Sequence, residues 1–316
     1  MTNIARVSTL QTSHTMMNYI LNAESKYNNL TEEAASGIRV NQPSDDPVAT
    51  KKILKMIADI NKLNGYSNNI SNAQSELETT SSALDSLTNL VQKASDYATQ
   101  AANGTYNADD LITIKSSVDQ IIQSVVDLAN TNYNGIYLFS GAATSTEPYS
   151  VAYDIDGNIT DITYNGTQTN DYQRYVTISD GVSVAINLKG SDVFGSYSSS
   201  GGTVTANGLF GNLMTLSKAL ADNDTSVINS CINSLNTDLG TVTTSNTKLA
   251  AVANRMDLTN ANIQQNITNL KGYKSELQDA DLTKVLTDLA NQENALKATY
   301  SVTSQMLSKT SLLQYL

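Results

Sequence analysis

The sequence predicts a mainly α-helical chain with a β-rich insertion, an α+β class. An elongated antiparallel coiled-coil or helical bundle, formed by the N- and C-terminal halves, carries a small outer β domain. Apolar residues recur every seven positions through two long segments, which is typical of coiled-coil helices. Alternation with a period of two is confined to residues of about 134–208, and the prolines at 43, 47 and 148 leave the rest of the chain free for uninterrupted helix.

Composition excludes several classes of function. A formal charge of −11 over 316 residues argues against nucleic acid and anionic lipid as partners. The sequence contains no run of about 18 apolar residues, the length that would predict a membrane-spanning helix. Cys231 and His14 are the only residues of their kinds, so an internal disulfide and Cys- or multi-His metal sites are excluded. We therefore expect no enzyme, no catalytic residue, no metal and no cofactor. The N-terminus shows no secretory signal peptide.

The first segment predicts a terminal helix that ends at a joint. Its apolar stripe runs from Met16 to Ala34 at helical spacing, and Gly37 suits a C-terminal cap. A new helix then starts at Pro47, where Asp46 can cap it and the pair Asp45 and Asp46 suits the helix dipole.

The second segment predicts a coiled-coil seam closed by Asn103-Gly104, and a third helix follows it at 3/4 spacing. The seam consists of Ile70, Leu77, Leu84, Val91 and Ala98, with partner positions Ala73, Thr80, Leu87, Ala94 and Ala101. The third helix is marked by Leu111, Ile114, Val118, Ile121, Val125 and Leu128.

The central segment, 134–208, reads as a β-rich domain. Asn134-Gly135, Asp156-Gly157 and Asp180-Gly181 are turn signals, the last two between alternating apolar runs. Asp154, Asp156 and Asn158 hint at a calcium loop, but the spacing and closing Glu of an EF-hand are missing, so a hairpin turn is preferred. Residues 198–202 have the composition of a flexible linker.

Helical spacing returns after residue 208, first in Leu209, Leu213, Leu216 and Leu220 and then in the longest seam. That seam is Ile228, Leu235, Val242, Leu249, Met256, Ile263, Leu270 and Leu277. A second seam position lies four residues after the first, and there Asn246, Asn260 and Lys274 stand in place of apolar residues. Gly240 weakens the expectation of a continuous helix. The phase breaks at Asp279 and Asp281, and Asp281 is a candidate cap for a last helix.

These breaks predict three parts: terminal helices at 1–43 and 279–316, a helical bundle at 44–133 and 209–278, and the outer β domain at 134–208. The terminal stripes are thin, so we expect the terminal helices to be disordered until neighbouring subunits bury them. The residues expected to pack in that assembly are Met16, Ile20, Tyr27, Leu30, Leu282, Leu286, Leu289, Leu296, Tyr300, Leu307 and Leu313. The expected domain joints are Asp45, Asp46, Pro47, Asp279 and Asp281.

Four stretches resemble the flagellin superfamily, and within it the junction proteins between hook and filament. Residues 30–48 resemble its N-terminal signature, with the junction-type joint Asp-Asp-Pro-Val-Ala at 45–49. Residues 134–141, Asn-Gly-Ile-Tyr-Leu-Phe-Ser-Gly, resemble the stretch that precedes the variable domain in junction proteins. Residues 174–194 resemble their β domain, and 277–290 with Leu312 and Leu313 resemble the family's C-terminal end. Ile38 departs from the pattern, where Lys or Arg is common.

The resemblance implies an extracellular structural subunit of the bacterial flagellum, exported unfolded through the flagellum's own channel without a cleaved signal. It implies an annular layer of like subunits, with the terminal helices lining the inner tube and the β domain outside. The implied partners are the other hook-associated junction protein, flagellin, further copies of the chain itself and a cytoplasmic export chaperone.

Two alternatives stay open at this stage. The chain could be a flagellin proper, although Asp-Asp-Pro and the Tyr-Leu-Phe-Ser-Gly stretch argue against it. It could also carry a filament-borne glycan-binding or hydrolytic module, with Tyr149, Tyr153, Tyr164, Tyr172 and Tyr175 as a sugar-binding surface. A lone helix-face histidine is the simplest reading of His14, and a small buried hydrophobe that of Cys231.

Overall fold

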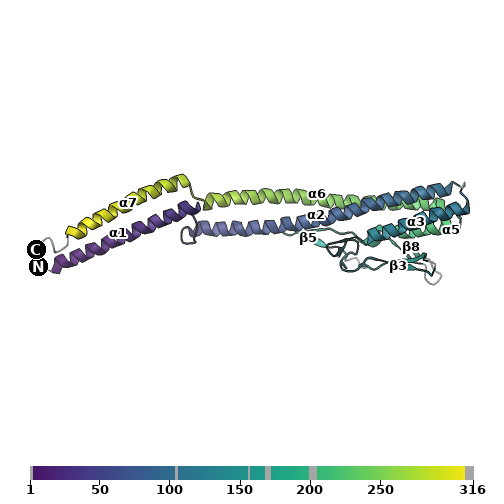
Figure 1. Ribbon diagram of the computed structural model, residues 1–316, viewed down its shortest axis with the longest axis horizontal. Helices are drawn as coiled ribbons and strands as arrows, with labels where there is room; N and C mark the ends of the chain where they lie inside the picture. Colours follow the sequence, from purple (N-terminus) through teal and green to yellow (C-terminus); the bar gives the residue numbers. More distant parts are fainter. Residues whose placement is uncertain (1–2, 104–105, 156, 168–171, 199–204, 310–316) are drawn as a thin grey trace. The chain divides into compact units, whose positions relative to one another are not determined.

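The computed structural model describes residues 3–103, 106–155, 157–167, 172–198 and 205–309. Its long helices are α1 (Asn3–Ser36), α2 (Pro47–Ala102), α3 (Ala108–Ala129), α5 (Gly208–Ala221), α6 (Thr225–Gln278) and α7 (Leu282–Lys309) (Figure 1). The chain divides into two compact units, residues 1–62 with 266–316, and residues 63–265. The helix breaks coincide with the predicted joints, and the three-part domain division stays a prediction.

The predicted seam of α2 is the buried face of that helix. All ten of its residues, five in each seam position, are at most 3% exposed. On α6 the first six seam residues, from Ile228 to Ile263, are at most 4% exposed, whereas Leu270 and Leu277 are half-buried. Gly240 does not interrupt α6, because the hydrogen-bonded turns on either side carry the helix through it. The mainly α-helical bundle is therefore confirmed.

Polar residues of the seam pair with one another across α2 and α6. Ser67 donates to Asn260 at 2.8 Å and accepts from Gln264 at 2.9 Å. Two turns further on α2, Gln74 donates to Asp257. Asn246 accepts from Ser81 and donates to Asp85, both at 2.7 Å. Because each pair is met in only one register, these contacts fix how far the two antiparallel helices slide.

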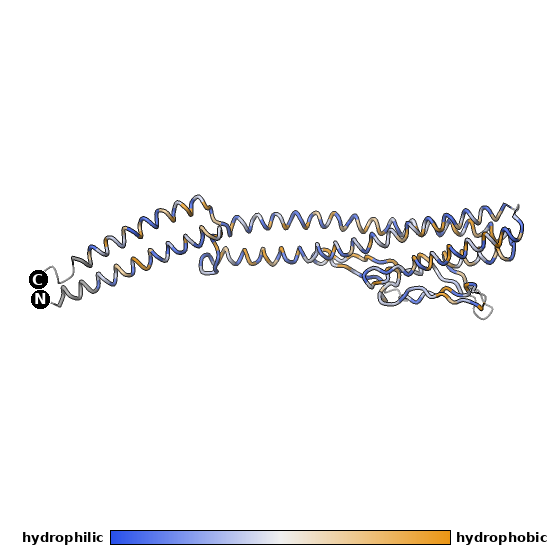
Figure 2. The backbone as a smooth tube through the Cα atoms, viewed as in Figure 1, coloured by the Kyte–Doolittle hydropathy of each residue, from blue (hydrophilic) through white to orange (hydrophobic). Residues whose placement is uncertain are grey.

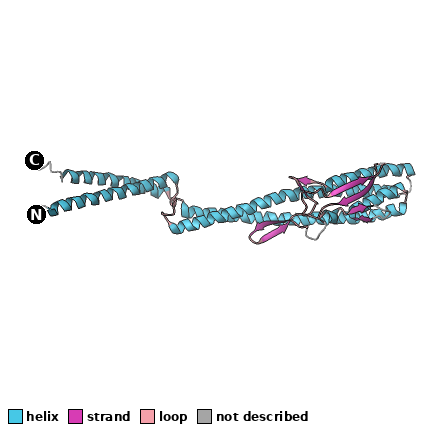
Figure 3. Ribbon diagram, turned by 90° about the horizontal axis from the view of Figure 1, so that it is seen from below, coloured by secondary structure: helices cyan, strands magenta, loops and turns pink. Residues whose placement is uncertain are grey.

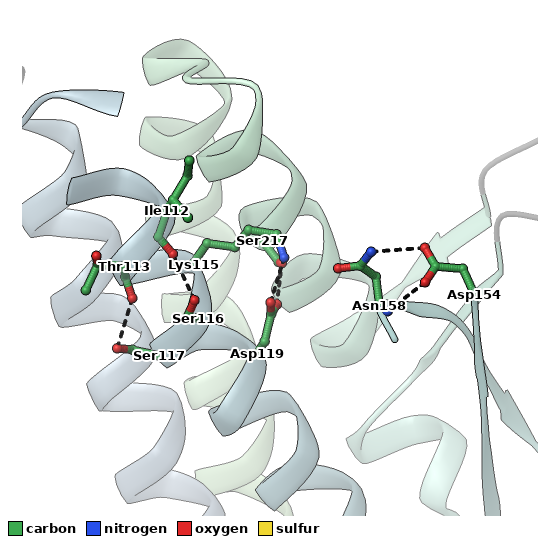
Figure 4. A network of polar contacts seen from close by, with 9 residues as sticks. All are labelled: Ile112, Thr113, Lys115, Ser116, Ser117, Asp119, Asp154, Asn158 and Ser217. Carbon is green, nitrogen blue, oxygen red and sulfur yellow. Dashed lines mark hydrogen bonds and ion pairs between the residues drawn. The ribbon is translucent and has the colours of Figure 1, made fainter. Parts of the chain in front are cut away.

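Helices α3 and α5 pack together and complete the bundle of the second unit. Asn107 and Asp110 form a capping box at the start of α3, and the four predicted leucines of α5 are at most 1% exposed. Asp119 of α3 accepts from Ser217 of α5 and pairs with Lys115 at 2.6 Å (Figure 4). Asp238 of α6 accepts from Asn212 of α5 at 2.6 Å. Cys231 is 4% exposed on α6.

The described residues of the β-rich insertion form three small antiparallel sheets, whose strands Figure 3 shows in magenta. Strands β1 (Asn132–Tyr133) and β2 (Ile136–Tyr137) form the first, and β5 (Tyr175–Ser179) and β6 (Val182–Ala185) form another. The third has the order β3 (Tyr149–Tyr153), β4 (Ile159–Tyr164), β7 (Ser196–Ser198), β8 (Thr205–Asn207). Asn134 and Gly135 both have positive φ, 50° and 82°, as the predicted two-residue turn requires.

The insertion has its own aromatic core, which the sequence analysis did not find. It contains all three phenylalanines of the chain, Phe139, Phe194 and Phe210, with Tyr149 and Tyr164. Ring centroids of Phe139 and Phe194 lie 4.9 Å apart, and those of Tyr149 and Phe210 lie 5.0 Å apart. Phe210 belongs to α5, so this core joins the insertion to the bundle.

Some parts of the insertion were not predicted. The helix α4 (Gly190–Val193) and the short strands β7 and β8 carry no clear pattern in the sequence. The pairing of β7 with β8 brackets the predicted linker, residues 198–202, of which 199–202 lie outside the described residues. Gly104 and Asp156, two of the predicted turn residues, also lie outside them.

In the first unit, α1 and α7 lie side by side (Figure 1). Along both helices, hydrophilic and hydrophobic residues alternate over short stretches (Figure 2). A small core lies where α2 begins and α6 ends, made of Val40, Ala49 and Ile53 with Ile57 and Leu277 packed against it. Among the side chains of α7 that the structure describes, that of Val285 is buried, at 5% exposure.

Candidate assembly surfaces

The two predicted joints lie next to each other and are hydrogen-bonded together. Gly37 ends α1 in the left-handed conformation, φ +69°, and its N–H donates to the carbonyl of Glu33 at 2.9 Å. Ile38 then forms an antiparallel bridge with Asp279, and Ala280 donates to the carbonyl of Gly37 at 2.9 Å. The two helix breaks, 242 residues apart in sequence (279 minus 37), are therefore joined to each other by backbone hydrogen bonds.

Arg39 adds backbone and side-chain hydrogen bonds to the pairing of the two joints. Its backbone N–H donates to the carbonyl of Gln278 at 2.7 Å, and its guanidinium donates to the carbonyl of Leu277, also at 2.7 Å. The same guanidinium lies 3.8 Å from the carboxylate of Asp46. A cation at the C-terminal carbonyls of α6 also satisfies acceptors that the helix leaves free.

The acidic residues of the joints act on backbone N–H groups. Asp46 accepts from Val48 and Ala49 at 3.1 and 2.9 Å and so caps α2, whose first residue is Pro47. Asp281 caps α7 by accepting from Thr283 and Lys284 at 3.0 and 3.2 Å.

The two other acidic joint residues also have partners. Asp45 accepts from the N–H groups of Asn41 and Gln42, and Asp279 accepts from Ser275. Because these carboxylates are used in caps and turns, the geometry fits the capping interpretation rather than a cation site. Within the described residues, no group of three His, Cys, Asp or Glu side chains is placed to hold a metal ion.

The predicted packing residues fall into three groups. Met16, Ile20, Tyr27 and Leu30 of α1, and Leu289 and Leu296 of α7, are half-buried. Leu282, Leu286 and Tyr300 are exposed, at 48%, 56% and 44%. The side chain of Leu307 and the whole of Leu313 lie outside the described residues.

Polar side chains also join α1 and α7. Gln292 donates to the carbonyl of Ala23 at 3.1 Å, and the hydroxyl of Tyr300 donates to the carboxylate of Glu24. Further apolar residues of the same helices are exposed, and the stripe did not include them: Met17, Tyr19 and Leu21 on α1, and Val302 and Met306 on α7. Two helices that leave this much apolar surface uncovered are suited to burying it against other chains.

The tyrosines of the insertion do not form one surface. Tyr149 and Tyr164 are 1% and 4% exposed and donate to the carbonyls of Gly195 and Phe139, at 3.0 and 3.1 Å. Burial raises the pKa of Tyr149 and raises that of Tyr164 to about 12, so both phenols stay protonated. The predicted sugar-binding surface is therefore wrong for these two residues, and Tyr153 and Tyr175 lie on different sheets.

The remaining polar residues and the groove show no arrangement typical of a catalytic or binding site. Asn158 donates to both oxygens of Asp154, at 2.8 and 3.0 Å, so these groups close a hairpin turn (Figure 4). His14 is exposed on α1. An open groove of about 480 Å³ between α2 and α3 contains one ionisable side chain, Asp127. Among the described residues, no helix is both long and apolar enough to cross a membrane.

Comparisons with known proteins find the same family at both ends of the chain. Residues 7–144 match the family model of the bacterial flagellin N-terminal helical region, and residues 232–316 match that of the C-terminal helical region. The flagellar hook-associated protein 3 of Salmonella typhimurium is 24% identical over 317 aligned positions, covering 95% of this chain and 96% of that protein. Flagellin FlaB1 of Treponema pallidum is 26% identical and covers 83% and 82%.

Solved structures share the fold. The flagellar junction protein FlgL of Legionella pneumophila superposes with a TM-score of 0.58 at 16% identity, over 72% of this chain and 99% of that one. FlgL of Bacillus cereus superposes with a TM-score of 0.54 at 19% identity, over 70% and 97%.

Proposed function

The chain belongs to the flagellin family, and from that premise we propose that it is the non-enzymatic structural subunit that joins hook to filament in a bacterial flagellum. The observation that carries the proposal is the extent of the match to hook-associated protein 3. That match runs through nearly the whole of both chains, insertion included, whereas the match to flagellin FlaB1 leaves about a sixth of each chain unaligned.

We propose an annular layer of like subunits, assembled through α1 and α7. Its support is the apolar surface that these helices leave exposed. Neighbouring copies would bury that surface and supply free energy that the isolated helix pair lacks, at about 25 cal/mol per Å² of apolar area. The exposed residues Leu282, Leu286 and Tyr300 are the positions that would contact other copies.

The further partners follow from the family rather than from any contact in the chain. We propose the other hook-associated junction protein below the layer and flagellin above it. We also propose export through the flagellar channel, with a cytoplasmic chaperone on the C-terminal region. The low burial of α1 and α7 supports such a route, because helices whose described side chains are nearly all exposed or half-buried cost little to unfold before passage.

Deletion of the gene in its native organism tests the proposed role. Electron microscopy of the cells and an assay of flagellin in the medium are the two readouts. Hooks without filaments, with flagellin shed into the medium, are the expected result. Hooks without filaments and no flagellin anywhere would instead identify the chain as a flagellin, which the 26% identity to FlaB1 keeps as a second candidate. Normal filaments would contradict both.

A matched pair of variants tests the role of α7. Leu286→Asn replaces a 56% exposed residue of α7, so the folded monomer should keep its melting temperature within about 1 °C while complementation of the deletion fails. The control, Leu258→Asn, replaces a 70% exposed residue of α6. Full complementation by Leu286→Asn, or equal failure of both variants, would refute the assignment.

A further inference from the structure

The first turns of α2 present a face that is both basic and apolar. Lys51 and Lys55 share it with Leu54, because residues three and four apart are neighbours on a helix. Leu54 is 60% exposed, and Val48, one turn before Lys51, is 68% exposed. The opposite side of the helix packs in the small core at the joint, to which Ile53 belongs.

The charge of this face is not neutralised by nearby carboxylates. Lys51, Lys52 and Lys55 are exposed and have no ion-pair or hydrogen-bond partner among the described residues. The carboxylate of Asp46 is used in capping α2, and Asp59 is half-buried without an ion pair to these lysines. Free ammonium groups beside exposed aliphatic side chains fit a partner surface with a free carboxylate and apolar residues.

The chain itself carries such a surface at the end of α6. Leu277 packs against the same small core as Ile53, so the last turns of α6 lie level with the first turns of α2 (Figure 1). Tyr273 is 55% exposed there, and the exposed Glu276 has no ion-pair or hydrogen-bond partner in the described parts of the chain. No other described segment comes within 4 Å of the position that a Cβ on Gly272 would take.

These three residues of α6 lie on a flank that holds no cation. At 3.6 residues per turn, Gly272, Tyr273 and Glu276 fall on one side of Leu277, whereas the lysines at 271 and 274 fall on the other side. The flank therefore offers a free carboxylate, an exposed aromatic ring and, at the glycine, room for an approaching side chain.

We propose that the basic face of α2 (Val48, Lys51, Leu54, Lys55) packs against the acidic flank of α6 (Gly272, Tyr273, Glu276) of the neighbouring copy in the assembled layer. The two lysines meet Glu276, and Leu54 enters the space at Gly272 beside Tyr273. Both surfaces lie at one level of the chain, so the contact sets copies side by side. Because the surfaces differ, each copy uses one toward each neighbour, as closure into a ring requires.

This inference rests on the proposed function for the layer of like subunits and adds the surfaces involved. The contact acts only within the assembly. Two exposed ion pairs and one aliphatic side chain do not offset the translational and rotational freedom that two free molecules lose on binding. Where other contacts already hold neighbouring copies at the end of the hook, the contact becomes an effectively intramolecular one. The free chain should therefore stay monomeric, and the test belongs in the assembled flagellum.

Charge reversal in cells that lack the native copy tests the contact. Lys51→Glu with Lys55→Glu should lower the fraction of cells with filaments about tenfold and release flagellin, since like charges then face each other around the whole layer. Glu276→Lys should act in the same direction, and the three changes combined should restore filaments. Lys93→Glu, an exposed reversal 38 residues further along α2 (93 minus 55), is the control and should leave filaments unchanged.

Normal filaments in the reversed strains would overturn the proposal, and so would a combined variant that does not recover. Loss of filaments with the lysine reversals alone, while Glu276→Lys assembles normally, would overturn the choice of a second copy, because the basic face would then serve a different subunit. The amount of each variant exported into the medium is measured alongside, so that a failure of export is recognised as such.

A disulfide reports the contact directly. Two variants expressed together, one with Lys55→Cys and the other with Glu276→Cys, can form a 55–276 link only between molecules. Mild oxidation of isolated flagella, followed by mass spectrometry, should yield this link. Lys93→Cys expressed with Glu276→Cys is the matched pair and should yield none. Assembly of both variants without the 55–276 link would overturn the proposal.

The two proposals fail separately. If the deletion strain sheds flagellin while the lysine reversals assemble normally and no disulfide forms, the contact is wrong and the junction role stands. If the deletion strain makes normal filaments while isolated flagella still yield the 55–276 link, the junction role is wrong and the contact stands.

Discussion

Gly195 and Gly208 lie at a close approach of two backbone segments at the edge of the insertion. Both have positive φ, 70° and 63°, and a Cβ on Gly195 would lie 1.8 Å from the carbonyl oxygen of Asn207. The two backbones therefore approach as closely as they do only because neither residue has a side chain. This contact aligns Phe210 with Phe194, and the N–H of Phe210 donates to the carbonyl of Phe194 at 2.8 Å.

Gly195→Ala should consequently destabilise the chain by about 3 kcal/mol or more, through both the clash and the strained φ. Urea unfolding followed by tyrosine fluorescence measures this. Gly157→Ala, at another positive-φ position but with open space around it, is the control and should cost only the strain, about 1 kcal/mol. Equal losses in the two variants would contradict the close-approach argument.

Asp238 gives the chain a predictable dependence on pH. Burial raises the pKa of this carboxyl in the folded state, and the hydrogen bond from Asn212 opposes the rise only partly. A raised native pKa means that the group stabilises the fold at pH below its unfolded value and that this contribution is lost as pH rises through the native value.

Asp238→Asn should therefore raise the melting temperature at pH 7 and leave it unchanged near pH 3, where the carboxyl is neutral in both states. Asparagine retains an acceptor for Asn212, so the bond itself survives. Differential scanning calorimetry from pH 3 to pH 7 tests this, with the exposed Asp96→Asn as control. A larger gain at acidic pH than at neutral pH would show that the sign is wrong.

At the scale of elements, the helices were predictable because their signal is periodic. A seven-residue repeat survives the loss of individual members, so α2, α3, α5 and α6 follow from the sequence even where Asn246 and Asn260 interrupt the seam. The short strands β7 and β8 were not predictable, because Ser196–Ser198 and Thr205–Asn207 are three residues each and largely polar. Their pairing depends on contacts from distant parts of the chain, which local pattern does not contain.

The residues of the joints and surfaces were likewise predictable where the signal is local and unpredictable where it depends on distant parts of the chain. The acidic caps at Asp46 and Asp281 could be predicted, since capping is decided within four residues. The pairing of Ile38 with Asp279 and the three-phenylalanine core depend on chain topology and could not. The exposed face at Lys51 and Lys55 has a visible sequence signal, a cluster of lysines, but the sequence alone does not say that the cluster lies opposite the core at Ile53.

The polar residues in the seam of α6 lower the stability of the fold. Asn246 occupies a seam position and gives up hydrophobic burial in return for its bonds to Ser81 and Asp85. Asn246→Leu should raise stability by about 1 kcal/mol, because an apolar residue packs better there. Together with Asn260→Leu it should also lower the urea m-value, as alternative registers of α2 and α6 become populated.

Equilibrium urea unfolding of both variants provides the two numbers. Asn262→Leu, an exposed position on the same helix, should change neither. A stabilised double variant with an unchanged m-value would mean that loops and packing set the register without these polar pairs.

At the scale of the whole molecule, the two compact units differ in how completely their apolar side chains are buried. The second unit buries complete seams and an aromatic core, whereas Val285 is the only buried residue on the described parts of α1 and α7. Local opening is easiest where few apolar side chains are buried.

Hydrogen exchange of the unassembled chain should therefore show α1 and α7 exchanging at least about 100-fold faster than α3 and α5. Mass spectrometry of peptides from all four helices measures the ratio within one sample. In assembled flagella the same peptides of α1 and α7 should become protected. Comparable protection of all four helices in the free chain would refute the expectation that the termini order on assembly.

Cys231 is buried on α6 beside its seam, and burial also raises the pKa of its thiol. Because thiolate is the form that reacts with maleimides, the native chain should take up such dyes slowly while it stays folded. A second cysteine at an exposed position would then carry nearly all of the fluorophore, with no need to remove the first. Single subunits could in this way be followed by light microscopy on a living, swimming cell.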